Sequence, residues 1–550
     1  MSTDDEHEDE SNDDEFDTSA VLDEAHLGDI EGAFGTITRH DVESRRSWRA
    51  RLLTLLAIMG PGLIVMVGDN DAGGVSTYSQ AGQNFGLTLL WTLPLLIPVL
   101  VVNQEMVVRL GAVTGVGHAR LINERFGRFW GAFSVGDLFI LNFLTIATEF
   151  IGVSLALHYF GISQYVSVPI AAVLLIAMTA TGSFRRWERF MFLFILVNFL
   201  IIPLAFLSHP AAGPFFAGFV TPGVKGGFTS TSVLLIIAIV GTTVAPWQLF
   251  FQQSNIVDKR ITPRWINYER ADTVIGSLIT VFAASLMMAV VASAFTGTPL
   301  FGHFINTGDV ATGLNHYVGH AAGAIFAIVL LNASIIGAAS VTLATSYAFG
   351  DVFGARHSLH RGWREAKFFY GAFTAMVVVA AGIVLIPRAP LGLITTSVQA
   401  LAGVLLPSAT VFLLLLCNDK EVLGPWVNRP WLNVLATAII SILLAMSLVL
   451  MATTLFSHIN VNELTQALGV VLAVAFVVGG TLYARALRRK PPEPVTPMEK
   501  RATWRMPALN LLRRPTWSRG RLMAMYLLRG YLVLAVVLLL VKAIQLGLHK

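Results

Sequence analysis

Residues 60–82 read GPGLIVMVGDNDAGGVSTYSQAG, a helix-length apolar segment that two acids, an asparagine and a glycine pair interrupt in its middle. A second interruption falls in residues 241–254, GTTVAPWQLFFQQS, where Gly241 and Pro246 precede three glutamines. In hydrocarbon, irregular backbone persists only where it lines a cavity or is buried in protein. Interrupted helices at corresponding places in two halves of a chain indicate the binding site of a transporter.

The composition around these two segments is that of a membrane protein. Hydrophobic residues make up 55% of the 550 residues and charged residues 13%, whereas soluble proteins carry about 25% charge. The apolar runs are continuous, which excludes a β-barrel with its alternating strands. The composition also excludes a soluble multidomain enzyme and a nucleic-acid binder. Because Cys417 is the single cysteine, no disulfide forms within the chain.

Apolar runs of about 20 residues predict membrane-spanning helices. Twelve such runs follow one another, and a thirteenth comes after a stretch rich in proline and arginine. We expect them near residues 52–81, 86–109, 129–157, 164–184, 190–208, 230–253, 269–296, 322–350, 368–387, 391–417, 432–456, 462–485 and 523–547.

Lysine and arginine are concentrated in alternate connections between these runs. One side of the membrane receives most of them, including eleven in residues 485–521. The other side holds Lys225 and Arg388, with Lys542 and Lys550 around the last run. Because cytoplasmic connections are enriched in Lys and Arg, we expect a multi-pass protein of the plasma (inner) membrane with a cytoplasmic N-terminus. No apolar segment follows a basic start, so we expect no signal peptide.

The predicted fold class is an all-α polytopic membrane protein with 12 or 13 transmembrane helices. Breaks in the first and sixth spans predict two five-helix inverted repeats. Of the 34 acids, 16 lie in the first 43 residues, a composition typical of a disordered segment. The predicted parts are an acidic disordered cytoplasmic tail (1–48) that the chemistry does not need, the first repeat (49–208), the second repeat (209–417), helices 11 and 12 (418–485), a basic cytoplasmic linker (486–522) and an extra helix (523–550).

Both broken segments resemble the Nramp family of divalent metal transporters. The family's first helix reads roughly GPGF-x₅-YIDPGN and its sixth GAxVMPHNLYLHS, where this chain has GPGLIVMVGDNDAGG and GTTVAPWQLFFQQ. Four more stretches are similar to the family in order and spacing: VRLGAVTGVGHARLINERFG (108–127), TEFIG (148–152), FRRWERF (184–190) and SVQALAGVLLP (397–407). The resemblance covers about residues 50–456. It implies a LeuT-type fold with the metal between helices 1 and 6.

The resemblance also implies site residues. Asp71 matches the family's metal-binding Asp, and Gln399 falls on a polar metal-site residue of helix 10. Three neighbouring positions depart from the family. Gly74 replaces its Asn, Ala245 replaces its Met, and Asp69 stands where the family has Tyr.

The chemistry of these residues supports a cation site and leaves alternatives open. Asp71 has no Lys or Arg in its own span, and an intramembrane acid is a functional candidate by default. The alternative is a carboxyl that binds backbone N–H groups freed by the break. Unwound backbone would let Asp69 converge with Asp71, or Asp69 is a vestibule acid. The Thr242 carbonyl is a candidate oxygen ligand, and Gln399 is either a ligand or a helix–helix hydrogen bond.

Without the Met and the Asn, the expected donors are carboxylate, backbone carbonyl and amide oxygen. Thioethers favour soft metals, whereas oxygen ligands suit Mg²⁺, Ca²⁺ and Mn²⁺. Mg²⁺ keeps several waters, for which Gly74 and Ala245 would leave space. We therefore expect Mg²⁺, or else Mn²⁺, as the transported ion, as in the Nramp-related magnesium transporters that the chain resembles. We expect no separate cofactor, no nucleic-acid partner, and the lipid bilayer as surroundings; protein partners are not predicted.

The positions that look like the family's proton route are largely replaced. Its two helix-6 histidines are Trp247 and Gln252, and its helix-3 acid three residues before Glu149 is Ile146. We therefore expect uncoupled uptake, with Gln248, Trp247, Gln252 and Glu149 along the pathway. Glu149 has a purely structural alternative. The competing functions are a proton-coupled Mn²⁺/Fe²⁺ transporter, a sodium-coupled organic-solute transporter and a metal sensor. The chain carries no enzyme motif, and we expect no enzyme.

Overall fold

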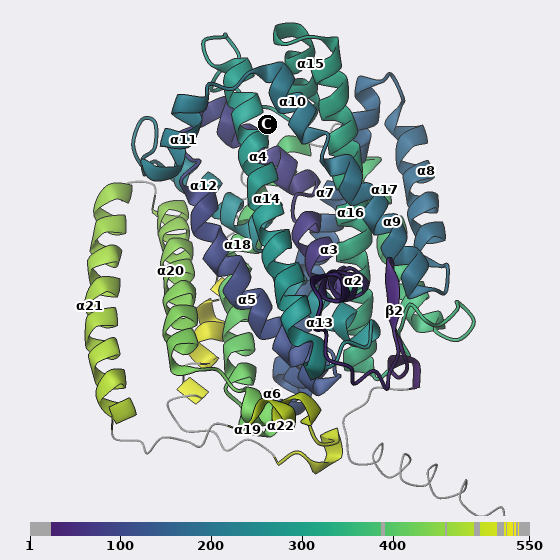
Figure 1. Ribbon diagram of the computed structural model, residues 1–550. Coiled ribbons are helices and arrows are strands. Elements are labelled where there is room, and N and C mark those ends of the chain that lie inside the picture. Colours follow the sequence, from purple (N-terminus) through teal and green to yellow (C-terminus); the bar gives the residue numbers. More distant parts are fainter. Residues whose placement is uncertain are drawn as a thin grey trace, which may run out of the picture.

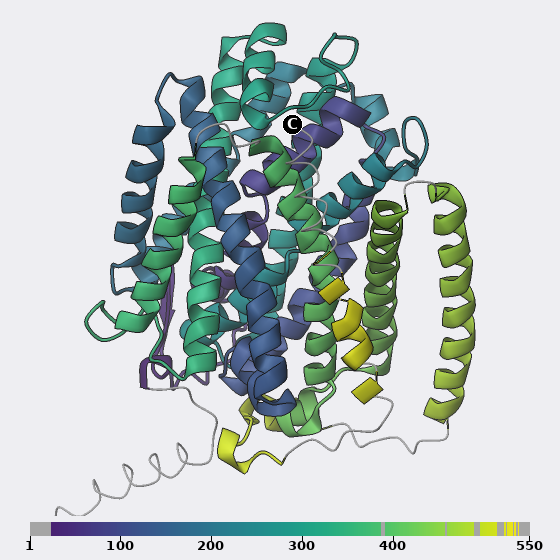
Figure 2. The same cartoon turned by 180° about the vertical axis from the view of Figure 1, so that it is seen from behind.

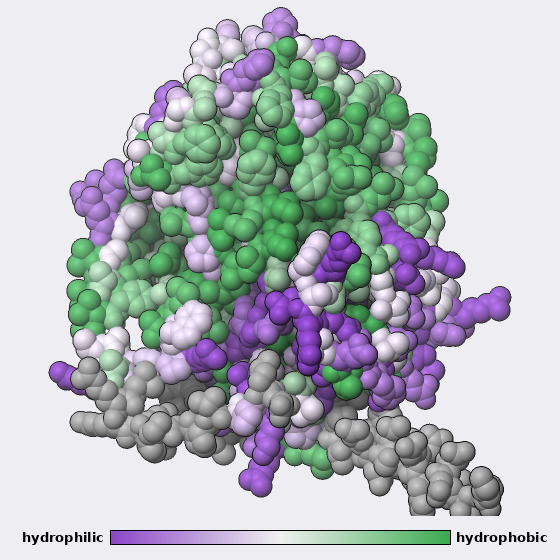
Figure 3. Space-filling view, in the orientation of Figure 1, coloured by the Kyte–Doolittle hydropathy of each residue, from purple (hydrophilic) through white to green (hydrophobic). Residues whose placement is uncertain are grey.

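The structure is a computed structural model that describes residues 24–386, 391–456, 459–488, 496–513 and several positions between 522 and 537. These residues form an all-helical bundle (Figure 1). Ten helices of the described part are long and apolar enough to cross a membrane, or up to eleven if one bent pair counts as a span. A broad hydrophobic band lies above a hydrophilic lower rim (Figure 3). The chain is therefore a multi-pass membrane protein.

The first half of the bundle starts with a broken helix and ends with another interrupted one. A short helix, α2 (Trp48–Ile58), precedes it, and α6 connects its second and third spans. The elements are α3 (Pro61–Gly68) and α4 (Ala72–Phe85), α5 (Thr92–Thr114), α6 (His118–Phe126), α7 (Arg128–Tyr159), α8 (Gln164–Thr179), α9 (Phe184–Asn198) and α10 (Ile201–Ser208).

The second half also contains a broken helix, α12 and α13, near its start. It is followed by two further long helices and short segments beneath the bundle. The elements are α11 (Ala212–Val220), α12 (Ser230–Thr243) and α13 (Pro246–Asp258), α14 (Ile266–Phe295), α15 (Thr307–Tyr317), α16 (His320–Phe353), α17 (Lys367–Val384), α18 (Leu391–Cys417), α19 (Lys420–Leu423), α20 (Pro430–Leu455), α21 (Val461–Arg488) and α22 (Met498–Thr503).

The two halves pack against each other through their broken helices. The second helix of the second half, α14, packs along both α3 and α4, and the second helix of the first half, α5, packs against α13. The third helices of the two halves, α7 and α16, also pack together, as do α12 and α18. Figures 1 and 2 show these helices in the centre of the bundle, with α20 and α21 outside it. Both breaks are therefore enclosed by protein on all sides.

Local chemistry explains where the broken helices begin. Gly60 has a φ of +152°, which favours glycine, and Pro61 takes the first turn of α3, where its missing N–H costs nothing. Pro246 starts α13 in the same way. The Asp71 side chain caps the N-terminus of α4. Each of the twelve predicted spans contains a helix, although the run 52–81 is divided into α2, α3 and α4, with α2 bent by 56° from α3.

Of the two predictions for the ends of the chain, one lies largely outside the described residues and the other needs correction. The thirteenth run, 523–547, lies largely outside the described residues. The predicted disordered tail, 1–48, is wrong for its second part, because residues 24–48 are ordered. They include a β-hairpin of β1 (Ile30–Gly32) and β2 (Gly35–Ile37), at the lower right of Figure 1.

The hairpin is ordered because the bundle offers it buried partners. The Ala33 N–H in the turn of the hairpin donates to Glu188 at 2.5 Å, and just before the hairpin the Ala25 carbonyl accepts from the Arg260 side chain at 3.0 Å. Ile30 and Ile37 are buried against the bundle. An acidic composition predicts disorder only when the rest of the protein offers the segment no charged partners and no apolar surface to pack against.

Part of the basic linker also packs under the bundle. The Met506 N–H donates to the Val113 carbonyl at 3.3 Å, and Arg505 donates to the Ala112 carbonyl at 3.1 Å. The Trp426 indole donates to the Arg501 carbonyl at 2.9 Å. This segment thus lies against the end of α5.

Candidate metal site

The break in the first helix places Asp71 in the centre of the bundle. Asp69 ends α3 and Asp71 begins α4, so the carboxyl-terminal end of one half-helix meets the amino-terminal end of the other. The Asp71 carboxylate accepts a hydrogen bond from the Gly74 N–H at 2.7 Å and is buried. The capping role considered from the sequence is therefore present. A carboxylate has about four acceptor positions, so this cap leaves Asp71 able to bind a cation.

The break in helix 6 supplies a carbonyl without its helical donor. Residue 246 is proline, so it has no N–H for the Thr242 carbonyl, four residues earlier. The Thr242 hydroxyl has no hydrogen-bond partner among the described residues. A Cβ placed on Gly74 would lie 3.3 Å from this hydroxyl oxygen. The two breaks therefore face each other across Gly74.

The space that we expected at Gly74 is not open. A Cβ on Gly74 would lie 2.7 Å from the Asp69 carbonyl oxygen, so the backbone of the break fills this position. The expectation of a water-sized gap at Gly74 is wrong, because the unwound segment folds back over it. Ala245 is buried at the N-terminus of α13.

Helix 10 brings Gln399 to the same place. A Cβ on Gly73 would overlap the Gln399 amide nitrogen and would lie 3.1 Å from Asp71 Oδ1. The Gln399 side chain is buried, and its amide nitrogen has no hydrogen-bond partner among the described residues. The Gln399 amide and the Asp71 carboxylate therefore both lie close to the backbone of Gly73.

Helices 3 and 8 close the other side of Asp71. Glu149 Oε2 accepts a hydrogen bond from the Ala72 N–H at 3.1 Å, directly after Asp71 in the chain. A Cβ on Gly337 of α16 would lie 2.5 Å from Glu149 Oε2 and 2.7 Å from the Asp71 Cβ. The glycine therefore lets two carboxyl groups from different helices come together.

The remaining predicted residues surround the breaks without joining one ligand set. Asp69 is fully buried, and neither of its carboxylate oxygens has a hydrogen-bond partner in the described part of the chain. The Trp247 ring packs on Gly68, where a Cβ would lie 3.2 Å from the ring. Gln248 accepts from the Gln104 amide at 2.9 Å.

Gln252 lies farther along α13 and binds α14. Its amide nitrogen donates to the Thr273 hydroxyl at 2.8 Å and to Glu269 Oε1 at 3.4 Å. These bonds tie helix 6 to helix 7 rather than turn Gln252 toward Asp71. Its place on a pathway stays a prediction.

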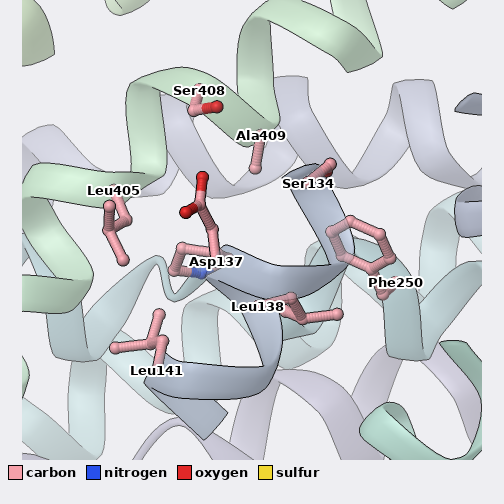
Figure 4. Close-up of a pocket in the computed structure, with 9 residues that line it drawn as sticks. Ser134, Asp137, Leu138, Leu141, Phe250, Leu405, Ser408 and Ala409 are labelled. Carbon is pink, nitrogen blue, oxygen red and sulfur yellow. The ribbon is translucent and has the colours of Figure 1, made fainter. Parts of the chain in front are cut away.

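A small cavity lies beside the helix-6 break. It has a volume of about 20 Å³ and touches Pro246 and Phe250 of α13, with α7 and α18 as its other walls. That volume holds about one water molecule. Asp137 points its carboxylate toward α18 in this cavity (Figure 4). Asp137 was not among the predicted site residues, although an acid inside span 129–157 was the available signal.

Two polar clusters at the lower end of helix 1 were not among the predicted site residues. Asp272 Oδ2 accepts from the N–H groups of Gly60, Gly62 and Leu63 at 2.8 to 3.2 Å and so caps α3 from helix 7. Lys259 and Glu188 form a fully buried ion pair at 2.6 Å. Their charges were visible in the sequence, but the partners lie on other helices.

The donors at the breaks are carboxylate, carbonyl, hydroxyl and amide groups. No group of three or more His, Cys, Asp and Glu side chains that could hold a metal occurs among the described residues. Carboxylates and neutral oxygens of this kind are the ligands of hard cations.

Comparison with known proteins decides the family. Residues 62–453 match the family described as natural resistance-associated macrophage protein-like, Nramp. The chain belongs to the Nramp family. It is 29% identical over 425 residues to the divalent metal cation transporter MntH 1 of Pseudomonas aeruginosa, covering 73% of this chain and 92% of that protein. It is 26% identical over 426 residues to MntH of Staphylococcus aureus, covering 72% and 91%.

The fold agrees with a solved Nramp structure. The Eremococcus coleocola manganese transporter, in complex with an aromatic bis-isothiourea substituted compound, matches with a TM-score of 0.58 and 23% identity, over 82% of this chain and 98% of that one. The expected all-α fold of LeuT type is confirmed. As an Nramp protein, the chain is a membrane transporter and not an enzyme.

Proposed function

We propose that this chain moves a divalent metal cation across the plasma membrane, with the ion bound between the breaks of helices 1 and 6. The observation that carries the proposal is the meeting of the Asp71 carboxylate with Gln399, opposite Thr242, in the buried centre of the bundle. Relatives named as divalent metal cation transporters match most of the chain. A formal negative charge at a helix break suits a cation far better than an organic anion.

Mg²⁺ is the ion that we propose as preferred. The argument is the donor set, which combines the Asp71 carboxylate with neutral oxygens and has alanine at position 245. A thioether there would favour softer metals, whereas Mg²⁺ is usually held by one or two carboxylates and retained water. Because Gly74 leaves no gap in this closed arrangement, we propose that the waters enter when the breaks move apart.

We further propose that uptake is uncoupled from protons. Trp247 and Gln252 carry no group that titrates near neutral pH, and both side chains are engaged in packing or in hydrogen bonds to α14. A second candidate is a proton-coupled Mn²⁺ transporter. It is favoured by the contact of Glu149 with the first residue of α4, beside Asp71, and by the names of the relatives.

The N-terminus is proposed to be cytoplasmic. The hairpin and the linker helix α22 lie at the same end of the bundle, beside the hydrophilic rim in Figure 3. Connections rich in Lys and Arg stay in the cytoplasm.

Uptake of Mg²⁺ and Mn²⁺ into proteoliposomes, followed with fluorescent indicators, tests the site. Asn is as good an N-cap as Asp, so Asp71→Asn keeps the cap of α4 and removes the charge. We expect at least a tenfold loss of initial rate for this variant and for Asp71→Ala. Glu365→Gln, in an exposed loop, is the control and keeps full activity. Wild-type rates in Asp71→Asn would show that capping is the whole role of Asp71.

A further inference from the structure

A second, larger cavity lies far from the helix breaks. It has a volume of about 440 Å³, within the range of small-molecule sites. It sits where the last part of α5 meets the first turns of α14 and α20 and the linker helix α22. Its walls are formed by Val101, Val102, Glu105, Arg109, Asn267, Arg270, Trp426, Val427, Arg429, Trp431, Leu432 and Arg501.

Four arginines share this cavity with one acid. Glu105 binds both Arg109, at 2.9 Å, and Arg270, at 2.5 Å. No ion pair to an acid is found for Arg429 or Arg501 among the described residues. Glu105 therefore pairs with two of the four guanidinium groups, and the residues that line the cavity carry an excess of positive charge.

Arg501 lies in an unfavourable electrostatic environment. Its guanidinium lies over the Trp426 ring at 4.2 Å from the ring centre, and its Nε is buried without a hydrogen-bond partner in the described part of the chain. Partial burial and the positive charges of Arg429, Arg270 and Arg109 lower the pKa of Arg501. Clustered, partly desolvated guanidinium groups are favourable only when an anion joins them.

The place of the cavity bears on which anion it takes. The last turn of α5 and the first turns of α14 and α20 lie at the lower edge of the apolar band, on the same side as α22 (Figures 1 and 3). Val101, Val102 and Leu432 supply apolar wall, and Trp431, which is 60% exposed, stands at its edge. Tryptophan is enriched at the level of lipid headgroups, and basic pockets between helices on the cytoplasmic side bind anionic headgroups.

We propose that this cavity binds a phosphate group, and specifically the headgroup of an anionic phospholipid from the leaflet beside it. Arg429 and Arg501 bind the phosphate oxygens, since guanidinium groups match phosphate geometry in a bidentate way. Val101, Val102 and Leu432 contact the upper part of the acyl chains. Because Arg501 comes from the linker, the bound lipid joins the linker to α5, α14 and α20. A metal cation is repelled from this cavity, so it is separate from the transport site.

Native mass spectrometry of the full-length protein with added lipid tests the proposal. We expect the wild type to retain phosphatidylglycerol and not phosphatidylcholine. Arg429→Gln combined with Arg501→Gln should weaken retention at least tenfold, whereas Arg364→Gln, in an exposed loop, should leave it unchanged. Arg429→Lys combined with Arg501→Lys keeps the charge and should retain part of the binding. Its thermal midpoint, measured beside that of the glutamine variant, separates lost binding from misfolding.

Two further arms identify the source of the phosphate. Inorganic phosphate and soluble glycerophosphoglycerol are added at millimolar concentration. If lipid is the ligand, neither displaces it. If either compound displaces the lipid, and so binds as well as the lipid although it has no acyl chains, the lipid assignment would be overturned. Equal lipid retention by the wild type and the folded glutamine variant would overturn the phosphate site itself.

Discussion

Asp71 combines a structural and a chemical role in one carboxyl group. It caps α4 through the Gly74 N–H and also faces Gln399 over Gly73 and Glu149 under Gly337. Three helices thus converge on a side chain that the first helix alone would leave exposed to hydrocarbon. The glycines matter as much as the acid, because each close approach uses a position where no Cβ intervenes.

Gly337→Ala tests the approach of the two acids. The added methyl group would lie 2.5 Å from Glu149 Oε2 and 2.7 Å from the Asp71 Cβ, so the carboxyl groups must separate. Overpacking of this kind costs about 1–3 kcal/mol, and we expect at least a tenfold loss of uptake. Gly371→Ala is the matched control, since nothing lies within 4 Å of the added carbon. Equal activity of the two variants would contradict the close packing of Asp71 and Glu149.

Ala245→Met tests the origin of ion preference. A thioether at the helix-6 break should strengthen inhibition of Mg²⁺ uptake by Cd²⁺ several-fold, because sulfur prefers soft ions. Ala245→Leu adds nearly the same volume without sulfur and therefore controls for crowding of this buried position. The measurement is the Cd²⁺ concentration that halves uptake. Identical values for Met and Leu would show that position 245 does not contact the ion.

At the scale of elements, the helices themselves could be predicted and their polar contacts could not. Long apolar runs indicated every described span, and the clusters around Asp71 and Pro246 indicated both breaks. The partners Gly337, Asp272 and Lys259 could not be predicted, since each acts on a residue about 70 to 210 positions away. Hydropathy registers the environment of a helix, whereas such contacts depend on how helices rotate against each other.

The N-terminal hairpin is the element that composition misjudged. The hairpin binds Glu188 at the start of α9 through Ala33, and Ala25, just before the hairpin, accepts from Arg260 after α13. Beside Arg260, Lys259 donates to the Ile58 and Met59 carbonyls before α3 at 2.7 and 2.8 Å. The acid-rich N-terminal sequence therefore contains a segment, the hairpin, that docks on the bundle and buries its isoleucines.

Truncation separates the hairpin from the acids that precede it. Deleting residues 1–40 removes the bonds of Ala33 to Glu188 and of Arg260 to Ala25, at about 1.5–3 kcal/mol for each bond to a charged group. We expect a lower thermal midpoint in detergent. Deleting residues 1–23 removes most of the acids, leaves the hairpin and should not lower the midpoint. Equal midpoints for both truncations would show that hairpin docking adds nothing to stability.

The whole molecule is a bundle whose two halves hold a closed centre between them. For transport, this closed centre must open alternately to the two sides of the membrane. The broken helices would move in that step, and α14 and α5 pack against them. Under the uncoupled import that we propose, the membrane potential acting on the charge of the ion supplies the energy for uptake. A divalent cation gains about 4.6 kcal/mol per 100 mV of membrane potential, on the order of a thousand-fold in accumulation.

Uncoupled import predicts a specific dependence on potential. In proteoliposomes at equal internal and external pH, an inside-negative potential should raise Mg²⁺ uptake, and an internal pH dye should stay constant. Glu149→Gln should keep most of the activity if no proton passes through that carboxyl group. Acidification that follows metal entry at a fixed potential would support the proton-coupled alternative instead.

The position of the hairpin also sets an order of events during synthesis. Ala33 binds Glu188, which is 155 residues later, and Ala25 binds Arg260, which is 235 residues later. At about 5–20 residues per second, the ribosome needs roughly 12 to 47 s to make that second partner. The segment around the hairpin therefore completes these contacts only after six spans have been made. Its docking then marks the completion of the first half and the opening of the second.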